Sequence, residues 1–473
     1  MFLMNREQVI NQKLHKYIQL IVVIAFYLFF AFFDGPNIGT DTAGYISMST
    51  HREPIYPLFL WILRLIFQHT FIDYLWVAAI IQSLIAAYAA WINCTFLTKE
   101  LKLNKLFSWG VLCIPAGVSL LYRQISAKNY MFSNSIITEG LAISVFLIFV
   151  RYAYEYALYN TKKPLCISVI LSVVLISIRK QMMITLAILA IIAFVNNLIK
   201  SKYDKKIKKL LASIITTLIV CVTVLVGNIG IEYAYSVAFT GNASQHTGSA
   251  RFIAAIAIYT SQREDVKYVD EPELKELFLD IYDTCEEKGY LLDSQLSGWH
   301  ERSVHFQKNC DDIQIRTLFH KTLDYAENKY PKNSIEAHKY ADEIMTDFTM
   351  SILPHHIPEV LMLYASNCIS GFVYTVAKPS TILTYFSVMI YLAYIALLVW
   401  MFINRKQDSV YKNLFVFSSV ILLSTVINVA VVAIGIFPQT RYMIYNMSFV
   451  YIALALMSVQ LCKVLYLKFR PSN

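Results

Sequence analysis

Charged residues are scarce in this sequence. Asp, Glu, Lys and Arg make up 15% of the 473 residues, whereas 57% of the residues are hydrophobic. An average soluble protein is about a quarter charged and about half apolar, so this composition excludes a soluble globular protein. The few charges are also clustered, and they leave apolar stretches of about 17 to 25 residues, the length that crosses a hydrocarbon core. The sequence therefore predicts an all-α polytopic membrane protein.

The eight cysteines lack any metal-binding or redox spacing. There is no Cys-x-x-Cys, and no cysteine lies at ligand spacing from a histidine. Cys285 and Cys310 lie in a long polar segment, where a disulfide between them is one interpretation and two free thiols the other. The first apolar run also lacks a small-residue cleavage site, so we interpret it as a retained helix rather than a signal peptide.

Ten apolar segments predict membrane spans. They cover residues 17–33, 74–97, 106–121, 137–158, 165–178, 182–199, 210–239, 382–403, 414–437 and 444–465. A further apolar segment, 55–67, is short for a span and contains Pro57 and Arg64. Such a segment predicts an interfacial helix that lies along the membrane. Together these segments indicate a bundle of about ten transmembrane helices.

Basic residues concentrate in the short loops on one side of this topology. With the N-terminus inside, they fall at residues 99–105, 162–163, 200–209, 405–412 and 468–470. Cytoplasmic loops are enriched in Lys and Arg, so the distribution predicts a multi-pass protein of the cell inner (plasma) membrane with both termini cytoplasmic. The formal charge of +9 is therefore a topology signal, and it does not indicate a nucleic-acid partner.

The long segment 240–380 then lies outside, and it holds more acidic than basic residues. Apolar residues recur there every three or four positions, which predicts a mainly helical extracytoplasmic segment. We therefore divide the chain into an N-terminal transmembrane module (1–239), this segment, and C-terminal transmembrane helices (381–473). The first outer loop of the N-terminal module (34–57) carries the main catalytic candidates.

Carboxylates and cations converge on the predicted outer face. They are contributed by four outer loops: Asp34, Asp41, Arg52, Glu53, Arg123, Glu139, Arg179, Lys180 and Arg441. A sugar donor linked to a polyprenyl phosphate presents its phosphate at this depth, where Arg or Lys can hold it by charge-assisted hydrogen bonds. Cations placed in advance favour departure of the phosphate, and a carboxylate opposite them accepts the proton of the attacking hydroxyl. The pattern predicts an inverting glycosyl transfer.

Four stretches of the sequence resemble a known family. They are the Asp41 loop with Tyr56-Pro-Leu after it, Ile137-Thr-Glu139-Gly-Leu-Ala, Arg179-Lys180-Gln181 and Gln439-Thr-Arg441-Tyr442. In order and sidedness they resemble the GT-C superfamily of integral membrane glycosyltransferases, which includes protein O-mannosyltransferases and the aminoarabinose transferases of lipid A. The resemblance covers the N-terminal module up to residue 200 and the last span, and the outer segment lies outside it.

The resemblance implies a role for each matching residue. Asp41 would be the catalytic base and Glu139 a supporting acidic residue. The donor phosphate would be bound by four residues: Arg179, Lys180, Arg441 and Tyr442. Arg52 and Glu53 would have supporting roles. The donor would be a polyprenyl-phosphate-linked sugar, and the acceptor a glycan, a lipid or a protein. The first loop has Asp41-Thr in place of an acidic pair, so the resemblance leaves a divalent metal cofactor open.

Purely structural interpretations stay open beside these roles. Asp41 precedes Thr42, where a helix can begin, and Asp is a favoured N-cap residue. Glu139 would offset the helix dipole at the start of its span. Arg179 would anchor its hairpin at the lipid headgroups.

Two other functions also remain as alternatives. The first loop is similar to that of membrane polymerases of exopolysaccharides or O-antigen, which join whole repeat units. A transporter or flippase is the non-enzymatic alternative, and such proteins usually show repeated halves and ionisable residues near the bilayer midplane. Here the ionisable residues gather at the ends of spans and no two halves match, which disfavours transport.

Overall fold

Backbone N–H and C=O groups inside a membrane need partners within the protein, and a helix supplies them within one segment. The long apolar runs of this chain accordingly form helices. The computed structural model describes residues 6–49, 52–126, 129–200, 205–241, 247–293, 295–378 and 380–469. Across these residues the regular elements are helices, and the β-type pairing is one isolated bridge between Asn37 and Ser135.

Nine helices in the described part of the chain are long and apolar enough to cross a membrane. They are α1 (Arg6–Asp34), α4 (Tyr74–Glu100), α5 (Lys105–Ile125), α6 (Thr138–Tyr159), α8 (Met183–Lys200), α9 (Lys206–Thr240), α16 (Thr381–Asn404), α17 (Ser409–Gly435) and α18 (Thr440–Phe469). The chain is therefore a polytopic helical membrane protein, as predicted.

The remaining predicted span forms α7 (Lys162–Ile178), whose 17 residues are one fewer than those of α8, the shortest of the nine. At about 1.5 Å per residue α7 is about 25 Å long, which is less than the thickness of a typical hydrocarbon core. The predicted segment 165–178 is nevertheless helical throughout. The predicted helix at 55–67 is also confirmed as α3 (Ile55–Phe67).

The helices fall into two units. Unit 1 comprises residues 1–244, 388–427 and 444–473, and unit 2 comprises 245–387 and 428–443. Unit 2 thus contains most of the segment predicted to lie outside the membrane. It also contains the last turns of α17 and the first residues of α18.

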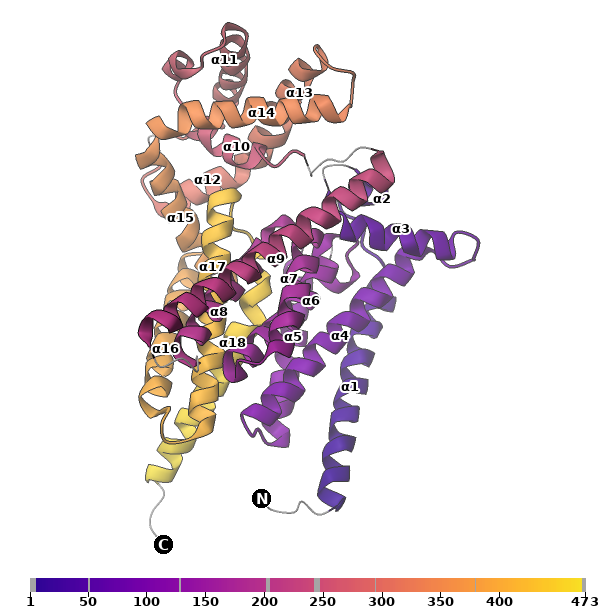
Figure 1. The fold of residues 1–473 in the computed structure, drawn as a ribbon, viewed down its shortest axis with the longest axis vertical. Helices are drawn as coiled ribbons and strands as arrows, with labels where there is room; N and C mark the ends of the chain where they lie inside the picture. Colours follow the sequence, from indigo (N-terminus) through magenta and orange to yellow (C-terminus); the bar gives the residue numbers. More distant parts are fainter. Residues whose placement is uncertain are drawn as a thin grey trace. The chain divides into compact units, whose positions relative to one another are not determined.

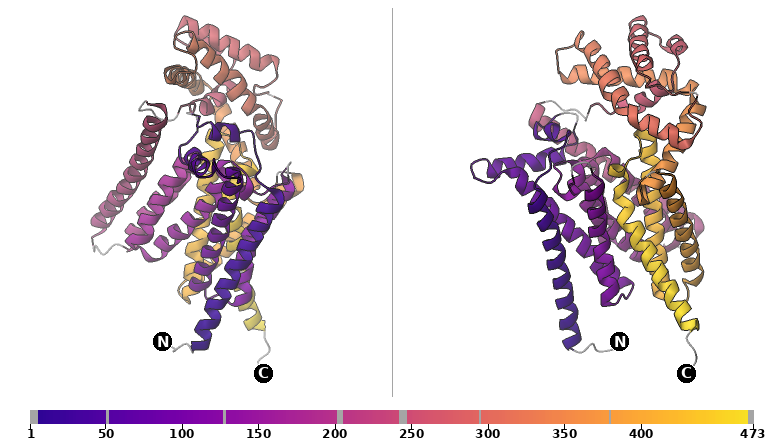
Figure 2. Two further views of the ribbon diagram at one scale, coloured as in Figure 1. Left: turned by 90° about the vertical axis from the view of Figure 1, so that its right-hand side faces the viewer. Right: turned by 180° about the vertical axis from the view of Figure 1, so that it is seen from behind.

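Unit 1 has two distinct ends (Figures 1 and 2). One of them, called the α2 end below, carries α2 (Thr42–Ile46), α3 and two short 3₁₀ helices, η1 (Phe132–Asn134) and η2 (Lys180–Met182). There α3 lies crosswise to α1 and α4 (Figure 1). The start of α1, the connection from α4 to α5 and the end of α18 lie at the opposite end, called the terminal end below. The Lys-rich stretch 99–105 therefore belongs to the terminal end.

A close backbone approach holds the α2 end together. Gln82 of α4 donates its Nε2 hydrogens to the carbonyl oxygens of Ser133, at 3.2 Å, and Ser135, at 3.0 Å. A Cβ atom on Gly140 of α6 would lie 2.6 Å from both Gln82 Nε2 and the Ser135 oxygen. Glycine is therefore required at this position, because any side chain would push apart α4, α6 and the strand-like stretch before α6.

Unit 2 is built from shorter helices around an apolar core. They are α10 (Arg251–Thr260), η3 (Arg263–Tyr268), α11 (Pro272–Glu287), α12 (Trp299–Asp311), the π-helix η4 (Asp312–Phe319), α13 (His320–Glu327), α14 (Ile335–Ile352), η5 (Leu353–His355) and α15 (Ile357–Val376). Phe278, Phe306 and Phe348 are fully buried in the core. Cys285 and Cys310 are buried there as free thiols, so the disulfide interpretation is wrong.

Candidate functional site

The loop between α1 and α2 is fastened to the start of α6. Asn37 N donates to the Asn134 oxygen over 2.9 Å, and Ile136 N donates back to the Asn37 oxygen over 2.9 Å. Thr42 is fully buried, and its Oγ1 donates to the Ile136 oxygen over 2.9 Å while accepting from Gly39 N. These bonds fix the position of α2 and hence of Asp41, which directly precedes it.

Asp41 occupies the N-cap position of α2, but its side chain makes no capping hydrogen bond. Its Oδ1 instead accepts a hydrogen bond from Arg52 Nη2 over 2.8 Å. The Asp41 side chain is 25% exposed and the Arg52 side chain 29% exposed. The capping interpretation of Asp41 therefore fails, and the carboxylate stays partly open to the outside of unit 1. By contrast, Asp73 at the start of α4 does cap its helix, since Oδ1 accepts from Leu75 N.

Arg52 is held in place by α2. Its guanidinium carbon lies 4.7 Å from the centre of the Tyr45 ring, and Nη1 is 3.4 Å from the Tyr45 hydroxyl. A Cβ on Gly44 would come within 3.0 Å of Arg52 Nε, so the missing side chain of Gly44 makes room for the arginine. A cation over an aromatic face is attracted to it, and the Asp41 carboxylate adds a second attraction.

Glu139 and Arg179 form a buried ion pair between the start of α6 and the end of α7. Glu139 is completely buried, and the Arg179 side chain is 11% exposed. Arg179 Nη1 donates to Glu139 Oε1 and, over 3.2 Å, to Thr138 Oγ1. Glu139 is thus more than a residue that offsets the helix dipole, because its carboxylate ties two helices together.

Lys180 pairs with a carboxylate that the sequence analysis missed. Its ammonium group is bound to Glu232 Oε1, and the Glu232 side chain is 5% exposed within α9. Asn228, one helical turn earlier, donates to Glu232 Oε1 over 2.9 Å and accepts from Ser177 Oγ over 3.1 Å. Glu53 reaches the same hairpin, since its Oε1 accepts from Lys180 N over 3.0 Å.

The charges of the Asp41–Arg52 and Glu139–Arg179 ion pairs both act on the phenol of Tyr45. Burial is the main cause that raises the pKa of its phenol, to about 12, and the charge of Glu139 comes next. Arg52, Asp41 and Arg179 act on the same phenol with smaller effects. All four charges therefore lie within electrostatic range of one side chain. Six of the eight predicted site residues lie around Tyr45 at the α2 end of unit 1: Asp41, Arg52, Glu53, Glu139, Arg179 and Lys180. We call them, with Glu232, the paired cluster.

Tyr45 in turn rests on a buried tyrosine. The rings of Tyr45 and Tyr56 meet edge to face with their centres 5.1 Å apart. Tyr56 is 0% exposed, and its hydroxyl donates to Gln82 Oε1 over 2.8 Å. The same Gln82 fixes the backbone at residues 133–135. A continuous chain of contacts thus runs from α4 to the Arg52–Asp41 pair.

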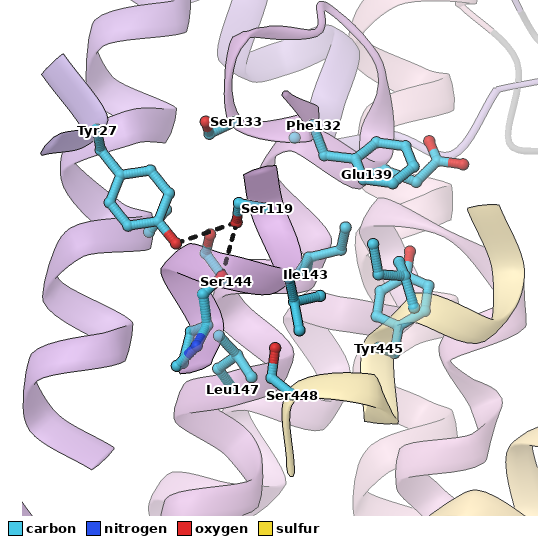
Figure 3. A pocket seen from close by; sticks show the side chains of 15 residues that line it. Tyr27, Ser119, Phe132, Ser133, Glu139, Ile143, Ser144, Leu147, Tyr445 and Ser448 are labelled. Atoms are coloured by element: carbon cyan, nitrogen blue, oxygen red, sulfur yellow. Dashed lines mark hydrogen bonds between the residues drawn. The ribbon is translucent and has the colours of Figure 1, made fainter. Parts of the chain in front are cut away.

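A cavity of about 40 Å³ is lined in part by Glu139, and Asp41 is not among its described lining residues. Figure 3 shows its lining, which includes Ser144, Tyr445 and Ser448, and the hydrogen bond of 3.2 Å between the Tyr27 and Ser119 hydroxyls. This volume holds no more than a few water molecules. A molecule of the size of a sugar therefore cannot enter this cavity in this conformation.

The other two predicted site residues, Arg441 and Tyr442, belong to unit 2. The Arg441 guanidinium lies 5.9 Å from the centre of the Tyr442 ring. The Tyr442 ring packs against that of Phe437, with the ring centres 6.2 Å apart. The backbone carbonyl oxygen of Tyr442 accepts a hydrogen bond from Asn428 Nδ2. Tyr442 thus contributes to the packing of unit 2.

No protein-family model, curated protein or solved structure matches this chain. Within the described ranges, no three or more His, Cys, Asp or Glu side chains gather as a metal site would require. The divalent metal that the resemblance left open therefore has no such ligand cluster in the described chain.

Two of the missed residues left signals in the sequence. Glu232 is an acidic residue inside a long apolar helix, and such residues usually face a partner within the protein. Tyr45 lies four residues after Asp41, one helical turn away, which is the spacing of side chains on one helix face. The partners of Tyr56 and Gln82, however, depend on how α3 crosses α4, and no local pattern predicts that crossing.

Proposed function

We propose that this chain is a membrane glycosyltransferase of the GT-C type. It transfers a sugar from a polyprenyl-phosphate donor to an acceptor on the extracytoplasmic face of the cell inner membrane, with inversion at the anomeric carbon. The proposal places the reaction at the α2 end of unit 1. It rests on the paired cluster and on the resemblance in the first outer loop.

One observation carries the proposal. The Asp41 carboxylate is a quarter exposed, does not cap α2, and is oriented by Arg52. A carboxylate at a helix start normally serves as a cap. Here Arg52, which lies on the Tyr45 ring, orients the Asp41 carboxylate and leaves it partly exposed. This arrangement suits a general base, because the base must reach the proton of an incoming hydroxyl.

In the proposed step the anomeric carbon exchanges its bond to the phosphate oxygen for a bond to the acceptor oxygen, and one proton moves to Asp41. The acceptor oxygen attacks the anomeric carbon while Asp41 takes the hydroxyl proton, and the bond between the anomeric carbon and the phosphate oxygen breaks. The phosphate leaves with the electron pair. Proton transfer to a positioned base typically contributes about 10² to 10⁴ in rate. Arg52 would keep Asp41 ionised before each turnover, since an adjacent cation favours the charged carboxylate.

The leaving phosphate would be received by the hairpin that contains Arg179 and Lys180. At an effective dielectric near 20, a cation about 4 Å from a unit negative charge is worth roughly 4 kcal/mol before desolvation is subtracted. Both cations already hold carboxylates, Glu139 and Glu232. The donor phosphate would therefore compete with these carboxylates, and Lys180, whose side chain is 36% exposed, is the more accessible cation.

The test is transfer activity of Asp41→Asn in the purified full chain. A polyprenyl-monophosphate sugar and a polyprenyl-diphosphate oligosaccharide are supplied as separate donors, so that single transfer and polymerisation are distinguished. We expect Asp41→Asn to lose about 10² to 10⁴ of the rate with unchanged folding.

Asp73→Asn is the matched control, because Asp73 is a true cap and Asn caps about equally well. It should leave transfer unchanged. If Asp41→Asn transfers sugar at nearly the wild-type rate, Asp41 is not the base. If neither donor is used by the wild-type chain, the proposed function is wrong.

A further inference from the structure

A basic cavity lies between α1, α4 and α5 at the terminal end of unit 1. It measures about 530 Å³, within the range of about 300–1,000 Å³ that small-molecule sites have. Its lining includes four lysines and a histidine: His15, Lys16, Lys99, Lys102 and Lys105. None of its lining residues within the described chain is acidic. The cavity therefore has the charge of an anion site.

The cavity also has a polar floor. Gln19 and Ser108 are each 1% exposed, and Gln19 Nε2 donates to Ser108 Oγ over 2.7 Å. Beside this floor, His15 Nε2 is buried and has no hydrogen-bond partner among the described residues. Because this nitrogen belongs to a residue that lines the cavity, a polar ligand in the cavity could supply the missing partner. The four lysines are exposed at the rim, where their ammonium groups can turn toward that ligand.

The N-terminus of α5 adds to the positive field. Asn104 lines the cavity and caps α5, since its Oδ1 accepts from Phe107 N over 2.9 Å. The first turn of a helix carries a partial positive charge, which favours an anion nearby. Helix α5 has 21 residues, so its dipole is fully developed.

Two carboxylates lie near the rim without lining the cavity. Glu100 Oε1 is 3.4 Å from Lys99 Nζ, and Glu100 also accepts a hydrogen bond from the Tyr159 hydroxyl. The backbone N–H of Val410 and, more weakly, the charge of Lys102 lower the pKa of Asp408. Within the described residues neither carboxylate forms an ion pair with Lys16 or Lys105, so the cavity keeps a net positive charge.

Exposed apolar side chains flank the cavity. Leu14 and Ile18 of α1 are 54% and 43% exposed, and Leu106 of α5 is 74% exposed. The preference of cytoplasmic loops for lysine accounts for basic residues at this end of the helices. It does not account for a concave site with a polar floor and an imidazole nitrogen that has no hydrogen-bond partner among the described residues. A ligand with an anionic head and apolar chains fits both parts of the surface.

We propose that the basic cavity binds the phosphate of an anionic phospholipid, whose acyl chains lie along Leu14, Ile18 and Leu106. The lysines hold the phosphate, and His15 Nε2 gains a polar partner. This site is separate from the paired cluster at the α2 end, so it stands or falls independently of the proposed glycosyl transfer.

The test measures lipid binding to the delipidated full chain by native mass spectrometry. Phosphatidylglycerol and phosphatidylcholine are titrated separately, and inorganic phosphate is added as a competitor. The cavity variant is Lys16→Gln/Lys99→Gln/Lys102→Gln. The matched control is Lys162→Gln/Lys163→Gln/Lys406→Gln, which removes three exposed lysines outside the cavity lining.

We expect phosphatidylglycerol to bind the wild-type chain in preference to phosphatidylcholine. The cavity variant should bind it at least about tenfold more weakly, since each lysine near an anionic headgroup contributes about fivefold. The matched control should bind as the wild type does. Replacing the same three lysines by arginine should preserve binding, and this variant separates loss of charge from misfolding.

Three outcomes would overturn the proposal. One is equal binding of the two lipids, and another is an equal loss of binding in the cavity variant and the matched control. The third is competition by millimolar inorganic phosphate, because that would identify the site as one for a free anion rather than a lipid headgroup.

Discussion

At the α2 end of unit 1, four cations each hold a carboxylate, whereas at the terminal end four lysines rim a cavity with no acidic lining residue. The pairs at the α2 end are buried to different degrees, and Asp41–Arg52 is the most open of those with a catalytic candidate. Pairing keeps the charges of the α2 end in fixed positions. At the terminal end the printed ion pair among the cavity lysines is Lys99–Glu100, and the cavity lining itself contributes no carboxylate that would compete with an anionic ligand.

Breaking a buried pair should therefore cost far more than removing a rim lysine. We expect Glu139→Gln to lower the free energy of unfolding by about 3–5 kcal/mol, because Arg179 would be left as an uncompensated buried charge. Lys102→Gln at the basic cavity should change it by less than about 0.5 kcal/mol. Unfolding of both variants in the same detergent provides the measurement. The double variant Glu139→Gln/Arg179→Gln should recover part of the loss, and equal stability of the two single variants would remove the contrast.

A tightly packed glycine at the α2 end should tolerate substitution far less than an unpacked glycine in α5. Gly140→Ala places a Cβ 2.6 Å from a backbone oxygen and from Gln82 Nε2, so we expect a loss of about 1–3 kcal/mol. Gly117→Ala in α5 is the control, because a Cβ there has no neighbour within 4 Å. It should be neutral or slightly stabilising, since Ala favours a helix over Gly. Thermal unfolding of the two variants decides the point, and a destabilised Gly117→Ala would contradict it.

Arg52 should matter for activity more than for stability, because its pair is partly exposed. We expect Arg52→Gln to reduce transfer about tenfold, equivalent to about 1.4 kcal/mol in the transition state. The pH at which activity falls on the acid side should move upward, because the cation that favours ionisation of the carboxylate is gone. Arg52→Lys should restore part of the rate. A pH–rate profile of Arg52→Gln that coincides with that of the wild type would exclude this role.

Tyr45→Phe should have the smallest effect. It keeps the ring on which Arg52 lies and removes a hydroxyl whose contact with Arg52 Nη1 is long, at 3.4 Å. We expect transfer to fall less than about threefold, in line with about 0.5 kcal/mol for a weak hydrogen bond. Burial raises the pKa of Tyr45 to about 12, so its hydroxyl stays protonated up to about pH 10. The pH–rate profiles of Tyr45→Phe and the wild type should therefore coincide up to that pH. Tyr45→Leu should be more severe, because it removes the ring.

The sequence predicts the elements of unit 1 better than their partners. Apolar runs locate the membrane helices, since a span must be long and apolar, and the 17 residues of α7 lie at the lower limit of that length. The Asp41 loop is recognisable because carboxylates, glycines and an arginine interrupt apolar sequence. These features are local, so a single sequence contains them.

The pairing within the site is not local. Asp41 and Arg52 lie 11 residues apart and Glu139 and Arg179 lie 40 apart, while Lys180 and Glu232 lie 52 apart. Which cation meets which carboxylate depends on how α6, α7 and α9 pack. A sequence pattern does not distinguish one Lys or Arg from another as the partner of a given carboxylate. Asn228 illustrates this, because the hydrogen bond that it accepts from Ser177 forms only where α7 and α9 lie side by side.

A density map of the full chain with polyprenyl monophosphate, in phosphatidylglycerol nanodiscs, tests the central claim most directly. The account predicts the polyprenyl phosphate at the α2 end, beside Lys180 and within reach of a sugar placed against Asp41, while a phospholipid headgroup occupies the basic cavity. A map in which the polyprenyl phosphate lies only in the basic cavity, with the α2 end unchanged, would contradict the assignment of sugar transfer to Asp41.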